Sequence, residues 1–311
     1  MDLSQRIIRS SIDWSGAGIV LADYLAGRFT YRSREEWCKR IESGEITLND
    51  KIVSPETILA LHDKVEYRPS DIEEPPADLD YRIVFEDEKV LVIDKPGNLC
   101  MHPAGPFFKH TLWHLLSSRY GTIHFVNRLD RETSGLLLAA KDAATAKKLS
   151  RSILQKKYQV IIHGDFPEEL PAEGFLLSAN SIIRKKRKFV NTMPGNPPFE
   201  SAKTTFKKLF CRNGLSLVEA TLFTGRMHQI RATLFSLGYP VAGDKLYGLD
   251  ETFYLKQRTG ELTEDDRKKL LLPRQALHSA FLEFTSVNAE VLNFTSPLPD
   301  DMKILTGEKQ L

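Results

Sequence analysis

The sequence contains little cysteine and no long apolar run, and both absences narrow the classes of protein it can encode. Its three cysteines, Cys38, Cys100 and Cys211, lie far apart and form no CxxC or Cys/His cluster. Neither a disulfide framework nor a zinc site is therefore indicated. No apolar stretch reaches the roughly 18 residues that a membrane span needs, and the N-terminus, MDLSQRIIRSS, lacks an apolar signal-peptide core. We expect a soluble, cytoplasmic protein with no membrane partner.

The chain also lacks a recognisable metal motif. His102, His110 and His114 lie close together, but their spacing matches no known pattern of metal ligands. We therefore expect no metal site. The length of 311 residues and the 41% hydrophobic content instead indicate roughly two globular domains with real cores.

Charge is nearly balanced overall, at +2, but it is segregated along the chain. Residues 71–88 hold eight acids against one base, Arg82, whereas residues 181–210 hold eight bases against one acid, Glu200. Such segregation can present a basic face to a polyanion such as RNA. For the run RKKRK at 184–188 taken alone, a solvated surface is the simpler interpretation.

The acidic stretch also marks a domain boundary. It contains Pro75 and Pro76 and few apolar residues, as expected of an extended linker. We therefore expect a domain over 1–70, a linker over 71–80 and a second domain over 81–311.

The first 70 residues predict a small module of helices followed by a β-ribbon. Apolar residues at helical spacing predict a short helix near 19–25. Ser33 and Glu36 form a capping-box pattern at the start of a second helix, which Gly44 can end. The alternating segment EITLNDKIVS, with Asn49-Asp50 at its turn, predicts a hairpin. Five bases cluster on the helical part, as in a compact RNA-binding module: Arg28, Arg32, Arg34, Lys39 and Arg40.

The segment SREEWCKRIESGEITLNDKIVSPETILALHDKVEY resembles the S4 RNA-binding domain. The matching positions are Ser33, Arg34, Ile41, Gly44, Ile46, Asn49 and Asp63. The resemblance implies that this α/β module binds RNA, with Arg34 among the contacts. Three acids, Glu35, Glu36 and Glu42, depart from the more basic helix that is frequent in that family, and an unrelated helical cap is the alternative.

The segment after the linker predicts two strands around a short turn. RIVFEDEKVLVIDKPGN contains the apolar run Val90 to Ile93 and ends at a Pro-Gly turn. Lys95, beside that turn, can contact a phosphate or can be a plain surface lysine.

The stretch FVNRLDRETSG at 125–135 places Arg128, Asp130 and Arg131 directly before the apolar run Leu136 to Ala140. We interpret the run as a buried strand, followed by a helix from Asp142 through Ile153. A loop anchored on a buried strand holds catalytic groups rigidly. Flanking arginines favour the charged form of the carboxylate. A structural salt bridge or a polar cap remains the alternative.

Two later segments supply further polar groups. In KKYQVIIHGDF the alternation predicts a strand with Tyr158 on the same face as Val160 and Ile162. The segment 215–248 predicts a strand, a tight turn at Thr224-Gly225-Arg226 and a helix ended by Gly238. Arg231 lies near the edge of that helix. It is either an ordinary surface arginine or, with Arg226 and His228, part of a convergent anion-binding or carboxylate-pairing site.

The segments NRLDRETSGLLL, KKYQV, TGRMHQIRATLFSLGYPVAGDKLYG and ALHSAFLEF, in this order, closely resemble the RluA-type RNA pseudouridine synthases. The resemblance covers roughly residues 81–300. It implies an α+β fold with a mixed, largely antiparallel sheet. It also implies that Asp130 is the catalytic carboxylate and that Arg231 pairs with it. Tyr158, the third catalytic residue that it implies, packs on the target base and can take part in removing a proton from it, and Arg128 replaces the flipped uridine. We expect further RNA contacts from Lys95, Arg226, His228, Arg184, Lys185 and Arg187.

The implied reaction breaks the C1′–N1 bond of uridine and forms a C1′–C5 bond, without net redox change or hydrolysis. No cofactor is then needed. Asp130 can act as a nucleophile at C1′ or as a base at the ribose, and the sequence does not choose. A glycoside hydrolase is disfavoured because its usual mechanism needs two carboxylates.

Three positions depart from the family pattern: Asn127 replaces His, Met227 replaces Thr or Ser, and Ser279 replaces Ala. For Asn127 we expect changed hydrogen bonding rather than lost activity. The S4-like companion favours large-subunit ribosomal RNA over transfer RNA as the substrate. An RNA-binding protein without turnover is the rival hypothesis, and a monomer is the expected state.

Overall fold

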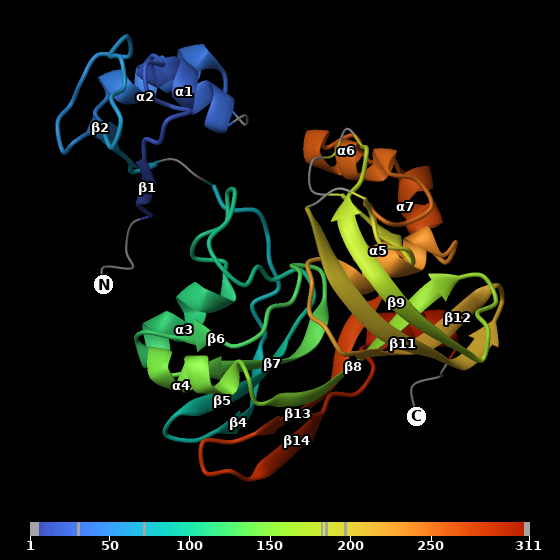
Figure 1. The fold of residues 1–311 in the computed structure, drawn as a ribbon. Helices are drawn as coiled ribbons and strands as arrows, with labels where there is room; N and C mark the ends of the chain where they lie inside the picture. Colours follow the sequence, from blue (N-terminus) through green and yellow to red (C-terminus); the bar gives the residue numbers. More distant parts are fainter. Residues whose placement is uncertain are drawn as a thin grey trace. The chain divides into compact units, whose positions relative to one another are not determined.

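The chain folds into two compact units with separate hydrophobic cores, and the division falls between Pro75 and Pro76. The computed structural model describes residues 6–29, 32–70, 73–181, 183, 186–195 and 198–307. Its two units, Met1–Pro75 and Pro76–Leu311, are drawn in Figure 1. The division falls inside the acidic stretch at 71–80 that we expected to be the linker.

The smaller unit has two helices and a three-stranded antiparallel sheet in the order β1-β3-β2. Its elements are β1 (Ile8–Ser11), α1 (Leu21–Arg28), α2 (Arg34–Glu42), β2 (Ile46–Leu48) and β3 (Lys64–Tyr67). The predicted capping box is confirmed: the Glu36 backbone N–H donates to Ser33 Oγ over 3.3 Å, and the Ser33 N–H donates to Glu36 Oε2 over 2.7 Å. Trp37 and Ile41, on the apolar face of α2, are fully buried.

The predicted hairpin is only half correct. Asn49 and Asp50 have positive φ angles of 50° and 64°, and Leu48 and Lys51 exchange two backbone hydrogen bonds across them. The turn is therefore tight, as these residue types favour. However, β2 pairs with β3 rather than with the residues after the turn. Residues 51–63 lie between the turn and β3. Asn49 holds the start of β3 next to β2, because its Nδ2 donates to Asp63 and its Oδ1 accepts the Lys64 N–H.

The larger unit is built on one eleven-stranded sheet. Nine strands form the path β10-β9-β11-β12-β8-β13-β7-β5-β4, and β14 and β6 pair with β13 and β7. The strands are β4 (Arg82–Glu86), β5 (Val90–Lys95), β6 (His124–Phe125), β7 (Ser134–Ala140), β8 (Ile153–His163), β9 (Glu169–Ser178), β10 (Arg187–Val190), β11 (Phe199–Arg212), β12 (Leu215–Leu222), β13 (Leu277–Thr285) and β14 (Val291–Thr295). The predicted strands around Lys95, Leu136 and Tyr158 are confirmed.

Helices cover parts of this sheet: α3 (Leu112–Tyr120), α4 (Ala143–Leu149), α5 (Gln229–Ser236), α6 (Thr252–Thr259), α7 (Glu264–Leu270) and α8 (Asp300–Thr306). Asp142 caps α4 by accepting the Thr145 N–H over 2.8 Å. The helix ends at Leu149 and not, as predicted, near Ile153, because Ile153 already begins β8. No helix in the described ranges is long and apolar enough to cross a membrane.

The sheet has two halves, which Figure 1 shows joined where β8 and β13 run side by side. Neighbouring strands pair antiparallel, except that β13 meets β7 in parallel at His278–Ser134 and Ser279–Gly135. Gly135 has a φ of 103°, and a side-chain carbon there would collide with the Ser279 backbone. The glycine that ends the FVNRLDRETSG stretch is thus required for β7 to pair with β13. The predicted mixed, largely antiparallel α+β fold is confirmed.

Candidate active site

The loop that carries Asp130 lies between β6 and β7, at the junction of the two halves of the sheet. Every residue of β7 is buried, so the loop is anchored on the core. The Thr133 N–H donates to the Asp130 carbonyl over 3.1 Å and closes a turn. A strand follows this loop, so Asp130 does not cap a helix. Its side chain is 33% exposed and therefore open to solvent on one side.

Arg231 joins the Asp130 loop to a second, fully buried carboxylate. Its Nη1 donates to Asp130 Oδ2 over 2.7 Å. Its Nε and Nη2 donate to the two oxygens of Asp244 over 2.6 and 2.9 Å. Of the two alternatives for Arg231, the ordinary surface arginine is wrong, because the residue is only 8% exposed, and the pairing with a carboxylate is present. A buried guanidinium held in this way has its position fixed on both sides.

The charges of Asp130, Arg231 and Asp244 shift one another's pKa values. Burial alone would raise the pKa of Asp130, but the positive charge of Arg231 outweighs it and the pKa lies below its ordinary value. Burial and Arg231 oppose each other in the same way at Asp244, whose pKa is also lowered. At Arg231, burial is outweighed by Asp244 and then Asp130, so its pKa is raised. All three groups are charged at neutral pH.

Tyr158 reaches the same region from β8. It is 7% exposed, and its strand partner on β13 is Ser279. Burial is the main cause that raises the pKa of Tyr158 to about 12, with the negative charge of Asp130 adding to it and the Ser279 hydroxyl opposing it. The phenol is therefore neutral at physiological pH.

His228 is oriented by a chain of hydrogen bonds that begins on another strand. The Arg187 backbone N–H donates to the Tyr247 hydroxyl oxygen over 2.8 Å, and that hydroxyl lies 3.0 Å from His228 Nδ1. The Tyr247 hydroxyl can donate to Nδ1 or accept from it, so this contact fixes the orientation of the imidazole and leaves Nε2 for a further partner. Burial, followed by the charge of Arg231, lowers the pKa of His228 to about 4, so the ring is neutral.

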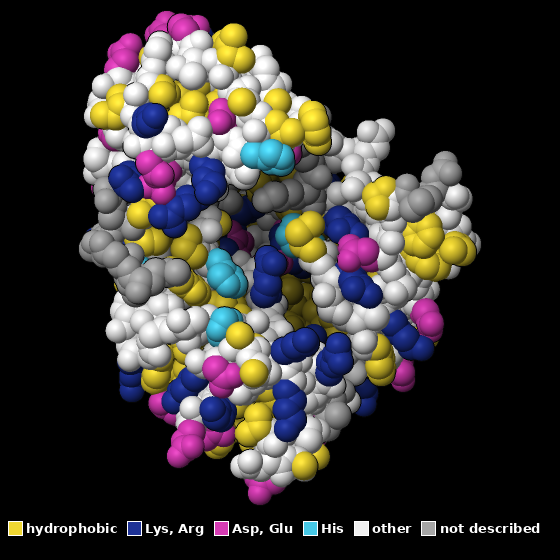
Figure 2. All heavy atoms as spheres, turned by 60° about the vertical axis from the view of Figure 1, so that its left-hand side comes forward, with side chains coloured by type: hydrophobic (Ala, Val, Ile, Leu, Met, Phe, Trp, Pro, Cys, Tyr) yellow, Lys and Arg dark blue, Asp and Glu magenta, His cyan; other side chains and the backbone are white. Residues whose placement is uncertain are grey.

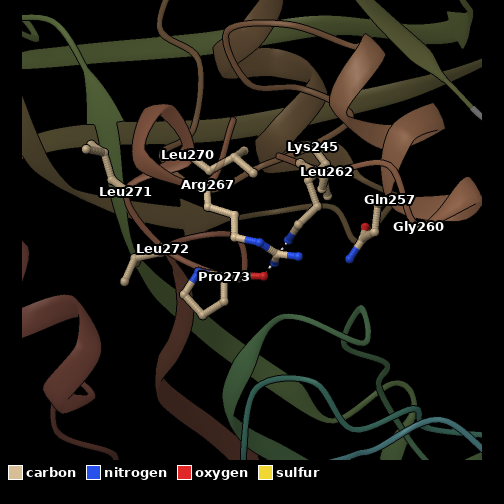
Figure 3. Close-up of a pocket in the computed structure, with 9 residues that line it drawn as sticks. All are labelled: Lys245, Gln257, Gly260, Leu262, Arg267, Leu270, Leu271, Leu272 and Pro273. Carbon is tan, nitrogen blue, oxygen red and sulfur yellow. Dashed lines mark hydrogen bonds between the residues drawn. The ribbon is translucent and has the colours of Figure 1, made fainter. Parts of the chain in front are cut away.

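An ion pair between Glu132 and Lys245 fixes the Asp130 loop on the side of the protein interior. The Lys245 ammonium donates to both Glu132 carboxylate oxygens, over 3.0 and 2.9 Å, and to the Pro273 carbonyl over 2.6 Å. Figure 3 shows Lys245 and Pro273 at the wall of a cavity of about 380 Å³ beside α6 and α7. Since its donors are taken, Lys245 serves the loop and not the cavity.

Lys95 does not lie where the sequence suggested. It is fully buried, and its ammonium donates to the carbonyls of Pro96, Leu99 and Arg131 over 2.7, 3.0 and 3.1 Å. Burial lowers its pKa to about 7. Both expectations, a phosphate contact and a surface lysine, are wrong, because the backbone around the Pro-Gly turn folds over the side chain and uses its donors.

The basic segment is less available than its composition suggested. Arg187 Nη2 donates to Glu200 over 2.6 Å and to the Leu176 carbonyl over 3.1 Å, and the side chain is 14% exposed. Lys186 is 6% exposed and bonds Glu251. The proposed RNA contact of Arg187 is not supported, because strand alternation in β10 turns it inward and leaves Lys188 exposed. Arg184 and Lys185 lie outside the described residues. Figure 2 shows Lys, Arg and His side chains, with Asp and Glu among them, on the surface turned to the viewer.

Three other predicted RNA contacts are exposed to solvent. Arg128 is exposed beside Asp130. Arg226 is 39% exposed, donates through Nε to the Ser201 carbonyl over 3.1 Å and lies 4.0 Å from Glu200. In the smaller unit Arg34 is 45% exposed and paired with Asp23 and Glu56, over 2.6 and 2.8 Å. Arg34 therefore carries two acids that an RNA phosphate would have to displace.

Asn127, at the position where the family pattern has His, forms one hydrogen bond through its side-chain oxygen. Its Oδ1 accepts the Leu138 N–H over 2.8 Å, which ties the loop to β7. Its Nδ2 is buried and has no partner in the described part of the chain. Met227 is 44% exposed, and Ser279 is 1% exposed and donates to the Leu136 carbonyl over 2.9 Å.

Sequence reasoning missed Asp244 and Tyr247. Both occur in the segment GDKLYG, whose glycines and buried aspartate give a local turn: Asp244 Oδ1 accepts the N–H groups of Leu246 and Tyr247, each over 2.9 Å. The acid directly after a glycine and before a lysine was the available signal. The same segment therefore holds both the outer partner of Arg231 and the partner of His228.

Solved structures of similar fold define the class. The human protein RNA pseudouridylate synthase domain containing 1 has a TM-score of 0.55, with 23% identity over 72% of this chain and 86% of that chain. The human protein RNA pseudouridylate synthase domain containing 4 has a TM-score of 0.52, with 24% identity over 71% of this chain and 89% of that chain. The larger unit thus has the fold of a pseudouridine synthase.

Sequence comparison leads to the family. The sequence model described as RNA pseudouridylate synthase matches residues 89–236. The ribosomal large subunit pseudouridine synthase D of Nitrosomonas europaea is 31% identical, over 87% of this chain and 76% of its own. The mitochondrial tRNA pseudouridine(32) synthase of Saccharomyces cerevisiae is 30% identical over 75% of this chain, which spans only 51% of that protein. The chain belongs to the RNA pseudouridine synthase family, whose members are RNA isomerases.

Proposed function

We propose that this protein isomerises a uridine of folded RNA to pseudouridine, with Asp130 as the catalytic carboxylate. The observation that carries the proposal is the Asp130–Arg231–Asp244 network, which joins residues 101 and 13 positions apart. It presents one ionised carboxylate, one-third exposed, at the junction of the sheet halves. The carboxylate is thus held by a buried arginine on one side and open to a substrate on the other.

Arg231 supports both mechanisms that are open to Asp130. As a nucleophile, the carboxylate would attack C1′ as the C1′–N1 bond breaks. As a base, it would remove a proton from the ribose. In either case it must be ionised and oriented before the substrate arrives, and Arg231 does both. Asp244 is fully buried and holds Arg231 in place, so it positions Asp130 indirectly, through Arg231.

The uracil must then rotate, bond through C5 to C1′, lose the C5 proton and gain a proton on N1. Tyr158 is suited to pack on the base during this rotation, because it is aromatic and neutral. Its pKa of about 12 favours packing over proton removal, since a phenol that keeps its own proton is a poor acceptor. His228 is neutral and oriented by Tyr247, and we assign its Nε2 a hydrogen bond with the uracil or its ribose.

The target uridine must leave its stack before reaching Asp130, at a cost of a few kcal/mol. Arg128 is exposed two residues before Asp130 and can fill the space that the base leaves. We assign it that role. Arg226 is exposed three residues before α5 begins, and we assign it to a contact with the RNA backbone.

Large-subunit ribosomal RNA is the favoured substrate. The smaller unit, S4-like in its motif, is assigned to RNA binding, with Arg34 among its contacts. The match to the Nitrosomonas europaea enzyme covers 87% of this chain. It must extend into the smaller unit, since Pro76–Leu311 is only about three quarters of the chain. Transfer RNA is the second candidate, supported by the 30% identity to the yeast mitochondrial enzyme.

The test is to incubate the purified protein with unmodified ribosomal RNA and, separately, unmodified transfer RNA, and to map pseudouridine chemically. We expect one or a few new sites, and none with Asp130→Asn, whose turnover should fall by roughly 10³-fold or more. RNA affinity and melting temperature of Asp130→Asn should match the parent. No new site with the parent on either RNA, or equal activity in Asp130→Asn, would refute the proposal. A collapse of the melting temperature would support a structural role.

A further inference from the structure

Lys156 is a half-buried lysine on the same strand face as Tyr158. The two residues are separated by one position on β8, so their side chains point to the same side of the sheet, about 6.6 Å apart along the strand. That side carries Val160 and Ile162, which are fully buried. Lys156 therefore continues the row of side chains that leads out from the candidate active site.

The ammonium of Lys156 lies against the loop that begins α5. A side-chain carbon placed on Gly225 would be 3.2 Å from Lys156 Nζ. Gly225 is the middle residue of the Thr224-Gly225-Arg226 turn, three residues before His228. Because Gly225 has no side chain, the ammonium has space at the edge of the site.

No acid compensates this charge within the described ranges. Burial lowers the pKa of Lys156, and no charged group or hydrogen bond acts against it. The neighbouring lysine differs: Lys157 points to the opposite face, bonds Glu219 over 3.2 Å and lies 6.0 Å from the Phe281 ring centre. A partly desolvated cation without a partner is costly unless a ligand supplies the anion.

We propose that Lys156 binds a phosphate of the RNA backbone next to the target uridine. RNA brings a negative charge at every nucleotide, and the phosphates beside a base packed on Tyr158 would lie within a few ångströms of that base. A bound phosphate would restore the charged form that burial disfavours. Asp130 is already held by Arg231, so the catalytic carboxylate is not the missing partner.

This inference rests on the proposed function for the location of the target uridine. Its test measures RNA affinity and not the rate of pseudouridine formation. In the Asp130→Asn background, the dissociation constant of a substrate RNA is measured against salt concentration for Lys156→Gln and for the matched control Lys157→Gln. Each lost phosphate contact lowers the slope of log K against log salt by about 0.7 to 0.9. We expect this decrease and a roughly 5- to 10-fold weaker affinity for Lys156→Gln, and neither for Lys157→Gln.

A slope for Lys156→Gln equal to that of the background would overturn the inference, as would equal losses in both variants. A lower kcat in otherwise wild-type protein with an unchanged slope would also overturn it, because Lys156 would then act on the base. Lys156→Arg should restore the slope, and matching melting temperatures would exclude misfolding. If the parent forms no pseudouridine while the slope change persists, the proposed function fails and the phosphate contact stands.

Discussion

Arg231 and Arg187 are two arginines of nearly equal burial with different surroundings. Arg231 is 8% exposed and bonds two aspartates from different loops. The side chain of Arg187 is 14% exposed and bonds one glutamate, Glu200, that is itself 43% exposed. Burial of the cation is thus not what distinguishes them. The difference is that one partner of Arg231, Asp244, is fully removed from water, whereas Glu200 is not.

The two partners of Arg231 differ in their exposure to solvent, so the network has a buried end and an exposed end. Asp244 is fully buried and accepts two backbone N–H groups besides Arg231. Asp130 is one-third exposed. The rigid end of the network is therefore inside the protein and the open end faces the substrate side, as expected for a positioned reactive group. The Arg187–Glu200 pair has no such inner end and only ties strands together.

The largest difference between the two pairs should appear in stability. Asp244→Asn removes the buried charge that compensates Arg231, and we expect the free energy of unfolding to fall by about 3 kcal/mol or more. Glu200→Gln breaks a pair on the surface side and should cost about 1 kcal/mol or less. Urea denaturation of the two variants measures both values. Equal losses would show that Asp244 is no more structural than a surface acid.

The second difference should appear in the pH dependence of the reaction. The pKa of Asp130 lies below its ordinary 3.8, so the carboxylate stays ionised as pH falls from about 8 to about 5. Arg231→Gln removes the positive charge that most lowers the pKa of Asp130, while burial, which raises it, remains, so the acid limb of the residual single-turnover rate should move to higher pH. Arg187→Gln should leave the limb unchanged. An unshifted limb in a folded Arg231→Gln variant would contradict the role of Arg231 in ionising Asp130.

The smallest expected effect concerns Tyr247, whose hydroxyl links the two regions. Tyr247→Phe leaves the Arg187 N–H without its acceptor and removes the hydrogen bond that orients His228, so we expect roughly 5-fold slower turnover with nearly unchanged RNA affinity. With the pKa of His228 at about 4, the parent rate should not change between about pH 6 and 8 through this residue. His228→Gln should retain more activity than His228→Ala. Equal rates in the two would exclude a hydrogen bond from Nε2.

Local patterns predicted much of the fold correctly. The capping box at Ser33, the buried strand before Asp142 and the strand at Tyr158 all depend on neighbours within a few residues. Their boundaries were less secure, as the early end of α4 shows. The pairing of β2 with β3 was missed because the partner strand begins 16 residues after β2 ends. Periodicity does not specify which strand comes alongside.

The candidate site was predicted in part for the same reason. Motifs identified Asp130, Tyr158 and Arg231 as a set, and the structure brings the charges of the first and third into contact. Lys95 and Arg187 were predicted from their charge, and in both cases the tertiary structure had already used the charge for backbone carbonyls or a neighbouring acid. Asp244 was missed because its importance lies in its contact with Arg231, not in its own sequence context.

The sequence by itself determined the chemical groups, their local elements and, through its motifs, the family. Only the tertiary structure decided which charges meet: that Arg231 lies between Asp130 and Asp244, that the donors of Lys95 bind carbonyls of its own and a neighbouring loop, and that Lys156 has no acidic partner among the residues that the structure describes. The physical reason is that helices, strands and caps depend on contacts within a few residues. The ionisation of a buried group depends on every charge within a few ångströms, whatever its distance along the chain.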